Sequence, residues 1–83
     1  MSTEAEPENL SGNPAREVLA LNLIRMRAAK GWSQEALAFE AGLHRTFVAH
    51  VERQARNISL DNLARLAVAL DVQPYVLLKP QRR

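Results

Sequence analysis

The apolar residues of this chain recur at intervals of three and four, the spacing of one face of an α-helix. The pattern predicts five helices, at about residues 14–30, 34–41, 45–54, 60–70 and 75–78. Alternating apolar and polar runs and hairpin dipeptides are absent, so no strand is expected. We therefore expect an all-α fold of about five short helices in one domain. The apolar positions at helical spacing that mark the buried side are Leu19, Leu23 and Met26 in the first helix, Leu37, Ala38 and Ala41 in the second, and Leu60, Leu63, Ala67 and Leu70 in the fourth.

Polar residues and glycines mark the ends of these predicted helices. The pair Asn13-Pro14 suits a helix start, because Asn caps well and Pro at the first position needs no N–H. Ser33 and Ser59 stand where the N-caps of the second and fourth helices should be. Gly31 and Gly42 can close the first and second helices in the left-handed conformation. The connections between helices are therefore short.

The composition limits the kind of protein this is. A length of 83 residues allows one domain, and an apolar fraction of 47% fits a globular chain. No run of about 18 apolar residues exists, so no membrane span is expected. There is no cysteine, hence no disulfide framework and no thiolate zinc site, and the acidic N-terminus does not fit a signal peptide. We expect a cytoplasmic protein.

Charge divides the chain into unequal parts. Residues 1–12, which we expect to be a disordered acidic tail, hold three glutamates and no Lys or Arg. Residues 14–83 carry eleven basic and six acidic side chains, a net charge of +5. The folded domain is expected at 13–79, followed by a basic tail at 80–83. A compact basic domain attracts polyanions, although charge alone is weak evidence of function.

The stretch "GLHRTFVAHVERQARN", residues 42–57, separates into two sides at helical spacing. Phe47, Val48 and Val51 form an apolar stripe. The opposite side is cationic and hydrogen-bonding, carries no acid, and consists of Arg45, Thr46, Ala49, His50 and Arg53. Such a helix can rest on the core by one side and offer the other side to a partner.

Two short helices joined by a glycine-containing turn form a helix-turn-helix, whose second helix can enter the DNA major groove. On that helix Arg45 could bond guanine O6 and N7 in a bidentate manner, and Thr46 could contact a base or a phosphate. Ala49 allows close approach and fits a thymine methyl, while His50 could donate to guanine N7. We therefore expect these four residues to read bases. The alternative is an ordinary solvated helix face.

The text "IRMRAAKGWSQEALAFEAGLHRTFVAHVERQARNISLDNLARLAVALDV" covers residues 24–72, or 49 of the 83. It contains "GWSQEALAFEAG" followed by "VAHVER", and at these residues the chain resembles the Cro/C1-type (Xre-like) helix-turn-helix family of bacterial and phage regulators. Within that family, "LHRTFVAHVERQARN" is most similar to the controller proteins of restriction–modification systems. The resemblance implies a lambda-repressor-like DNA-binding domain.

The resemblance also implies roles for single positions. Gln34 matches a residue that contacts a DNA phosphate, with an ordinary first-turn residue as the alternative. Arg56 and Asn57 match loop positions near the DNA backbone. We expect Arg53 to contact the DNA backbone as well. Arg27 and Glu52 match a partly buried ion pair that joins the first and third helices. The chain departs from the family pattern at three places: Phe47 where tyrosine is frequent, Phe39 where a charge is frequent, and Gln54-Ala55 where glycine is frequent.

Metal and enzyme chemistry find no support in the sequence. His44 and His50 are six residues apart, which places them on different helix faces, and no acid pair completes a metal site. His44 is instead expected to be a helix cap or a backbone contact. No serine stands beside a histidine and an acid, and no glycine-rich phosphate loop occurs. We expect no enzyme activity, no metal and no cofactor.

The function predicted from the sequence is that of a transcriptional regulator that binds double-stranded DNA at an inverted repeat, as a homodimer, through its third helix. The apolar residues that the core does not need, and that are expected to form the dimer interface, are Val68, Tyr75, Val76 and Leu77. The alternative is an antitoxin or protein-interaction module, so a toxin or RNA polymerase stays open as a further partner. No membrane association is expected.

Overall fold

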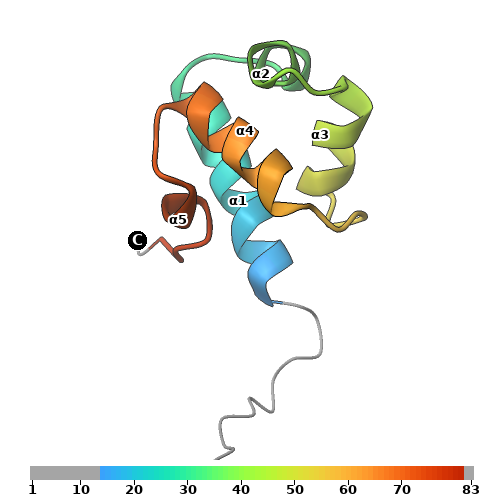
Figure 1. The fold of residues 1–83 in the computed structure, drawn as a ribbon. Coiled ribbons are helices and arrows are strands. Elements are labelled where there is room, and N and C mark those ends of the chain that lie inside the picture. The colour runs from blue at the N-terminus through green and yellow to red at the C-terminus, as the bar shows by residue number, and fades with distance from the viewer. Residues whose placement is uncertain (1–13, 82–83) are drawn as a thin grey trace, which may run out of the picture.

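The computed structural model describes residues 14–81, which form five α-helices and no strand (Figure 1). The all-α expectation is therefore confirmed. The predicted acidic tail and the Asn13 cap lie outside the described residues, as do the last two residues of the basic tail. The helices are α1 (Pro14–Ala29), α2 (Gln34–Ala41), α3 (Arg45–Glu52), α4 (Leu60–Leu70) and α5 (Pro74–Leu77).

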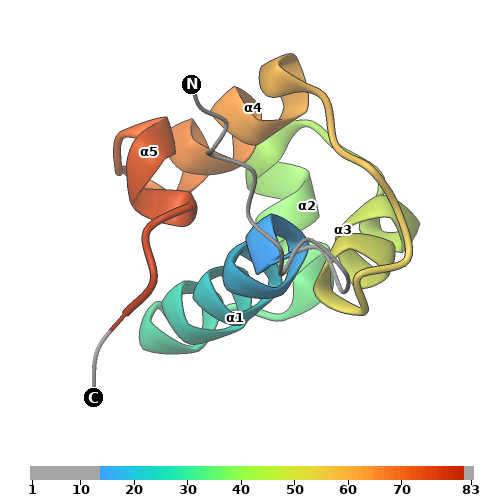
Figure 2. The ribbon, with the colours of Figure 1, turned by 90° about the horizontal axis from the view of Figure 1, so that it is seen from below.

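Helices α1 and α4 overlap in the view of Figure 1 but lie on opposite sides of the molecule in the second view. Helix α2 packs against α3 and α4, and α5 packs against α1 and α4. Both ribbon views place α3 and α5 on opposite flanks of the molecule (Figure 2). Helix α3 therefore has one side on α1 and α2, and its other side is not covered by any described helix.

One continuous apolar core joins all five helices. Leu23, Leu37 and Leu66 have no exposed surface, and neither do Val48 and Leu77. The apolar stripes predicted for α1, α2 and α4 therefore face inward, with two departures. The core consists of Leu19, Leu23, Leu37, Ala38, Ala41, Val48, Val51, Leu63, Leu66, Ala67, Leu70 and Leu77.

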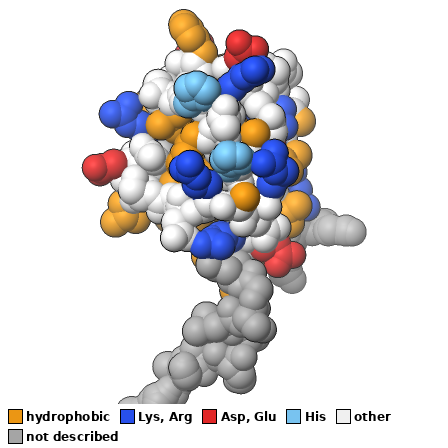
Figure 3. All heavy atoms as spheres, turned by 90° about the vertical axis from the view of Figure 1, so that its right-hand side faces the viewer, with side chains coloured by type: hydrophobic (Ala, Val, Ile, Leu, Met, Phe, Trp, Pro, Cys, Tyr) orange, Lys and Arg blue, Asp and Glu red, His pale blue; other side chains and the backbone are white. Residues whose placement is uncertain are grey.

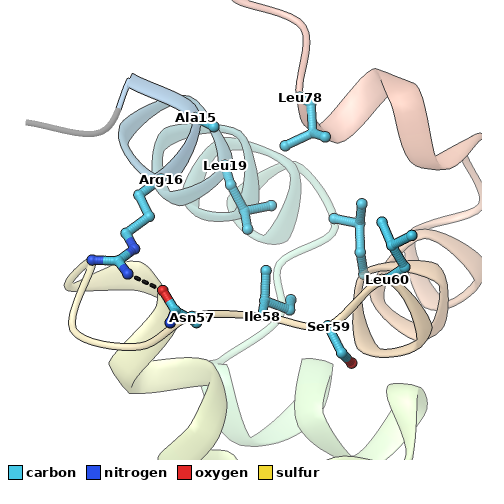
Figure 4. A pocket seen from close by; sticks show the side chains of 9 residues that line it. Ala15, Arg16, Leu19, Asn57, Ile58, Ser59, Leu60 and Leu78 are labelled. Carbon is cyan, nitrogen blue, oxygen red and sulfur yellow. Dashed lines mark hydrogen bonds between the residues drawn. The ribbon is translucent and has the colours of Figure 1, made fainter. Parts of the chain in front are cut away.

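The departures are Met26 and Leu60. Met26 is only partly buried and packs against the edge of the core. Leu60 is 81% exposed, so helical spacing alone was misleading there. It is the first residue of α4 and lies beyond the last layer of the core, at the rim of an open hollow of about 280 Å³ (Figure 4).

The helix ends follow the predicted caps. The Ser33 hydroxyl oxygen accepts from the Ala36 N–H at 3.0 Å. The corresponding oxygen of Ser59 caps α4 in the same way, also at 3.0 Å. Gly42 ends α2 at φ 70°, a conformation that costs glycine nothing. Helix α3 ends at Glu52, two residues before the predicted end, because Gln54 adopts the left-handed conformation at φ 61°.

A buried amide fixes α5 to α1. Asn22 is 1% exposed, and its Nδ2 donates to the carbonyl oxygens of Leu77 at 2.8 Å and Lys79 at 3.0 Å. These carbonyls lie at the end of a four-residue helix, where no further turn supplies donors. Asn22 thus holds in place a helix too short to be stable alone.

The position of Leu77 corrects one prediction. Leu77 was expected at a dimer interface, but its side chain is completely buried in the core of its own chain. Helix α5 turns this residue toward α1 and α4, so it cannot contact a second copy. The prediction for Leu77 is wrong because α5 closes one end of the core, which helical spacing does not record.

Candidate nucleic-acid interface

Helices α2 and α3 are joined by the three residues 42–44, in a helix-turn-helix arrangement. The Leu43 N–H donates to the Ala38 carbonyl at 2.9 Å, which holds the turn against the end of α2. His44 is the N-cap of α3, and its Nδ1 accepts from the Thr46 N–H at 3.2 Å. A side chain at Gly42 would be crowded, because its Cβ would lie 3.2 Å from Nη1 of Arg65. The His44 cap is one of the sequence expectations, and the structure contains it.

Helix α3 separates its side chains as the sequence predicts. Val48 and Val51 are buried in the core, and Phe47 packs partly against it. On the other side, Arg45, Thr46 and Arg53 are exposed, while Ala49 and His50 are half-buried. The small Ala49 leaves the middle of this face low, so that a flat or grooved partner can approach the helix backbone closely.

The surface around α3 is basic. Figure 3 looks onto the α3 side of the molecule, where Lys and Arg side chains gather around a histidine at the centre of the face. Both histidines of the chain, His44 and His50, are on this face, and the acidic side chains stand at its margin. The exposed arginines that α3 and the loop after it contribute are Arg45, Arg53 and Arg56.

A hydrogen-bonded network fixes α3 to α1 and α2. Arg27 donates to both carboxylate oxygens of Glu52, from Nε at 2.8 Å and from Nη2 at 2.9 Å. Its Nη1 also donates to the Trp32 carbonyl at 3.0 Å. The Glu52 side chain is only 4% exposed and that of Arg27 is 19% exposed. The pKa of Arg27 is raised, mainly by the hydrogen bond to Glu52, although burial opposes that shift.

Gln34 joins the same network. Its Nε2 donates to Oε1 of Glu52 at 2.8 Å, which ties the first residue of α2 to the last residue of α3. The amide has a second hydrogen, and within residues 14–81 that hydrogen has no acceptor. Gln34 is half-buried, so this hydrogen can still reach a partner at the surface. The side chain is therefore held in place at the edge of the α3 face.

The loop between α3 and α4 contacts an arginine of α1 that the sequence did not indicate as part of this face. Arg56 and Asn57 are both exposed at this loop, as a backbone-contacting role requires. Arg16, from the first turn of α1, donates to Oδ1 of Asn57 (Figure 4). Because 41 residues separate the two, only the folded chain brings Arg16 to this edge. No local pattern in the sequence could have indicated it.

The apolar residues predicted for the dimer interface lie on α4 and α5. Val68 and Tyr75 are 78% and 68% exposed on α4 and α5, and Val76 is half-buried. Phe39 on α2 is 81% exposed and lines a shallow surface hollow together with His44 and Arg45. Residues 14–81 hold no cluster of His, Asp and Glu suited to a metal. Within the same residues, no helix has the length and apolar character needed to cross a membrane.

The family model Helix-turn-helix (HTH_3) matches residues 23–77, from the middle of α1 to the end of α5. The chain belongs to the helix-turn-helix family. The resemblance that the sequence motifs indicated is thereby confirmed. This is a family of DNA-binding transcriptional regulators rather than of enzymes.

Two curated relatives are similar to most of this helix-turn-helix chain. A hypothetical transcription factor from Neisseria meningitidis serogroup B is 52% identical over 69 residues, which are 82% of this chain and 65% of that protein. The chain thus spans slightly less than two thirds of that relative's length. Control protein C.BamHI from Bacillus amyloliquefaciens is 45% identical over 67 residues, or 80% of this chain and 83% of that protein.

Solved structures give the same fold. The hypothetical transcription factor NHTF from Neisseria has a TM-score of 0.79 at 51% identity, over 81% of this chain and 75% of that one. The restriction-modification controller protein C.AhdI from Aeromonas hydrophila has a TM-score of 0.72 at 48% identity, over 75% and 94%. SinR, a master regulator for biofilm formation solved in complex with DNA, has a TM-score of 0.70 at 29% identity, over 74% and 98%.

Proposed function

We propose that this helix-turn-helix protein is a transcriptional regulator that binds double-stranded DNA with sequence specificity, reading an inverted repeat as a homodimer through α3. The observation that carries the proposal is the asymmetry of α3. Val48 and Val51 fix it to the core, while Arg45 and Thr46 at its start are exposed on a basic surface. An α-helix with its side chains is about 10–12 Å across, and the major groove is about 12 Å wide, so the exposed side of α3 can enter it.

Base reading is assigned to the exposed side of α3. Arg45 supplies a bidentate donor for guanine, and Thr46 supplies a hydroxyl and a methyl group. Ala49 permits close approach, and His50 extends the contact one turn further along the groove. These residues begin at the helix N-terminus, which is the end that reaches base edges in a helix-turn-helix.

Contacts with the DNA backbone are assigned to the margin of the same face. Gln34 offers its remaining amide hydrogen to a phosphate, next to the N-terminus of α2, where anions are favoured. Arg53 and Arg56 supply charge, and Asn57 is held by Arg16 at the loop. Phosphate contacts position the protein without reading sequence, so these residues set affinity and register.

Dimerisation is assigned to the exposed apolar residues of α4 and α5. A single domain of this size buries little surface on DNA, and operators for this motif usually comprise two half-sites. Val68 and Tyr75 are large, apolar and mostly exposed, which is costly for a monomer unless a second copy covers them. Half-buried Val76 completes this surface. A twofold dimer would present its two α3 helices about 34 Å apart.

Selection of bound fragments from a random DNA library tests this proposal. The selected sequences should contain an inverted repeat whose half-site centres are about 10 base pairs apart. Sedimentation of the protein with the selected duplex should give two chains per site. If no sequence is enriched, the proposal of specific DNA binding is overturned. If a single half-site occupied by one chain is enriched, the proposed dimer is overturned.

The similarity to C.BamHI and C.AhdI favours a narrower form of the same function, that of a restriction–modification controller. In that case genes for a methyltransferase and a nuclease should stand beside this one. The selected inverted repeat should also lie in their shared control region. A neighbouring toxin gene, together with a toxin complex recovered with the purified protein, would support the antitoxin alternative instead.

A further inference from the structure

The N-terminal caps of α2, α3 and α4 differ in chemistry. Helices α2 and α4 are capped by the hydroxyl oxygens of Ser33 and Ser59, which do not change protonation in water near neutral pH. Helix α3 is capped by an imidazole, because Nδ1 of His44 accepts from the Thr46 N–H at 3.2 Å. Among these three caps, only the His44 cap of α3, the proposed reading helix, can therefore be removed by a proton.

The cap requires the neutral form of the ring. Nδ1 of His44 can accept a hydrogen bond only when it carries no proton, so the ring proton must be on Nε2. A second proton turns this acceptor into a donor that faces the N–H donor of Thr46. The resulting imidazolium also places positive charge at the positive end of the helix dipole. His44 is exposed, so protons from the solvent can reach its ring.

The cap is important because α3 is short. The helix has eight residues, and Arg45 and Thr46 form its first turn together with Phe47. The His44 carbonyl still accepts from the Phe47 and Val48 N–H groups, at 3.0 and 3.3 Å. The Thr46 N–H, however, depends on the side chain. Loss of the side-chain cap therefore loosens the turn that carries the two leading base-reading candidates.

We propose that His44 is a positioning residue for sequence recognition: its neutral imidazole holds the first turn of α3, and protonation releases that turn. The inference rests on the proposed function, in which this turn reads bases. Protonation should lower discrimination between the operator and other DNA. It should not lower the affinity for random DNA, because an imidazolium adds positive charge beside the phosphates.

Charged groups from three helices surround the cap. Glu35 of α2 and Arg45 of α3 line the same surface hollow as His44. Arg65 of α4 reaches the turn at Gly42, two residues before His44. The experiment must therefore follow the ring and the cap separately.

Two variants isolate the side-chain cap. In H44N the new residue is among the best N-caps and does not titrate, whereas H44A provides no side-chain acceptor. Nuclear magnetic resonance of the free proteins would follow the histidine rings and the Thr46 amide from about pH 8 to about pH 5.5. The exchange protection of the Thr46 amide in the wild type should fall about fivefold as the His44 ring gains its proton, the factor expected for loss of a helix cap.

In H44N that protection should persist across the range, and in H44A it should be low throughout. A wild-type Thr46 amide that is unchanged while the His44 ring titrates overturns the proposal. Because this measurement needs no DNA, it stands apart from the proposed function.

The second measurement uses the selected duplex and a random duplex at one fixed salt concentration. Discrimination is the dissociation constant for the random duplex divided by that for the selected duplex. For the wild type, this ratio should fall about fivefold toward low pH, as the cap is lost. For H44N this fivefold fall should be absent, so its ratio should change less than that of the wild type. His50 is present in both proteins, so any effect of its own protonation appears in both and cancels in the comparison. An equal fall in H44N overturns the role of His44, whereas the absence of any preferred duplex overturns the proposed function.

Discussion

Gln34 donates its side-chain amide to Glu52 across 2.8 Å, which joins the first residue of α2 to the last residue of α3. The same carboxylate receives two hydrogen bonds from Arg27 of α1. One nearly buried acid thus holds three helices together, and it does so directly behind the face proposed to read DNA. The orientation of α3 depends on this carboxylate as well as on the apolar core.

Replacing Glu52 with alanine should therefore destabilise the fold strongly. The change leaves the Arg27 guanidinium partly buried without its partner, at a cost of about 3 kcal/mol in the free energy of unfolding. Glu40→Ala, which removes an exposed acid from α2, is the matched control and should change stability by less than about 0.5 kcal/mol. Urea denaturation of the three proteins provides the comparison. Equal midpoints would mean that the network contributes no stability.

The pH dependence of this contribution follows from the raised pKa of Arg27. For a cation whose pKa is higher in the folded state, the stabilisation is complete below the unfolded-state pKa and is lost only as pH rises through the folded-state value. The stability difference between wild type and Arg27→Met should therefore be constant from about pH 7 to about pH 10. A difference that shrinks within this window would contradict the assignment.

Two hydrogen bonds from Arg27 still hold Glu52 when Gln34 is replaced. Gln34→Ala should therefore remove mainly the phosphate contact and weaken binding to the selected duplex and to random DNA by the same factor, because such a contact carries no sequence information. The slope of log affinity against log salt concentration should not change, since a neutral amide releases no counterion. Arg53→Ala is the informative comparison, because each lost phosphate charge should reduce that slope by about 0.9. A loss confined to the selected duplex would instead give Gln34 a role in specificity.

Arg45→Ala should cost about 1–3 kcal/mol on the selected duplex and relax the preference at one position in each half-site. On random DNA only the charge is lost, so the cost there should be smaller. Lysine at this position should recover part of the affinity but little of the discrimination, since it lacks the bidentate fork. Titrations of selected, single-mismatch and random duplexes at one salt concentration distinguish these effects. Equal losses on all three would reduce Arg45 to a phosphate contact.

The dimer surface can be separated from the core by two kinds of substitution. Val68→Glu and Tyr75→Glu add charge at exposed positions, so they should convert dimer to monomer and leave monomer stability almost unchanged. Leu77→Ala removes a fully buried side chain and should cost about 2–5 kcal/mol in unfolding free energy. Sedimentation and thermal denaturation together separate the two effects. A Val68→Glu protein that remains a dimer would move the interface elsewhere, with exposed Phe39 as the next surface to test.

Features that depend on neighbouring residues could be predicted from the sequence. Ser33, Ser59 and Gly42 act within one helical turn, so their caps were readable. The division of α3 into a buried and an exposed side follows from the spacing of Val48 and Val51 within eight residues.

Features that depend on contacts between distant segments could not be read in this way. Asn22 stands within the inner stripe of α1, but its partners are carbonyls more than fifty residues away. The exposure of Leu60 and the burial of Leu77 depend on where the core ends, which helical spacing does not record. Likewise, the family resemblance implied a phosphate contact for Gln34, whereas its hydrogen bond to Glu52 is visible only in the folded chain.

The three hydrogen bonds that Glu52 receives also affect whether the protein or the DNA deforms in the complex. Because hydrogen bonds to Glu52 join α1, α2 and α3, we expect each reading helix to move with its domain rather than to adjust its tilt alone. In the proposed dimer, any misfit between two such domains and straight duplex must be absorbed by bending or twisting the DNA between the half-sites. Flexible steps in that uncontacted spacer, such as TA, should then favour binding. The operator would thus be recognised partly through how easily it bends.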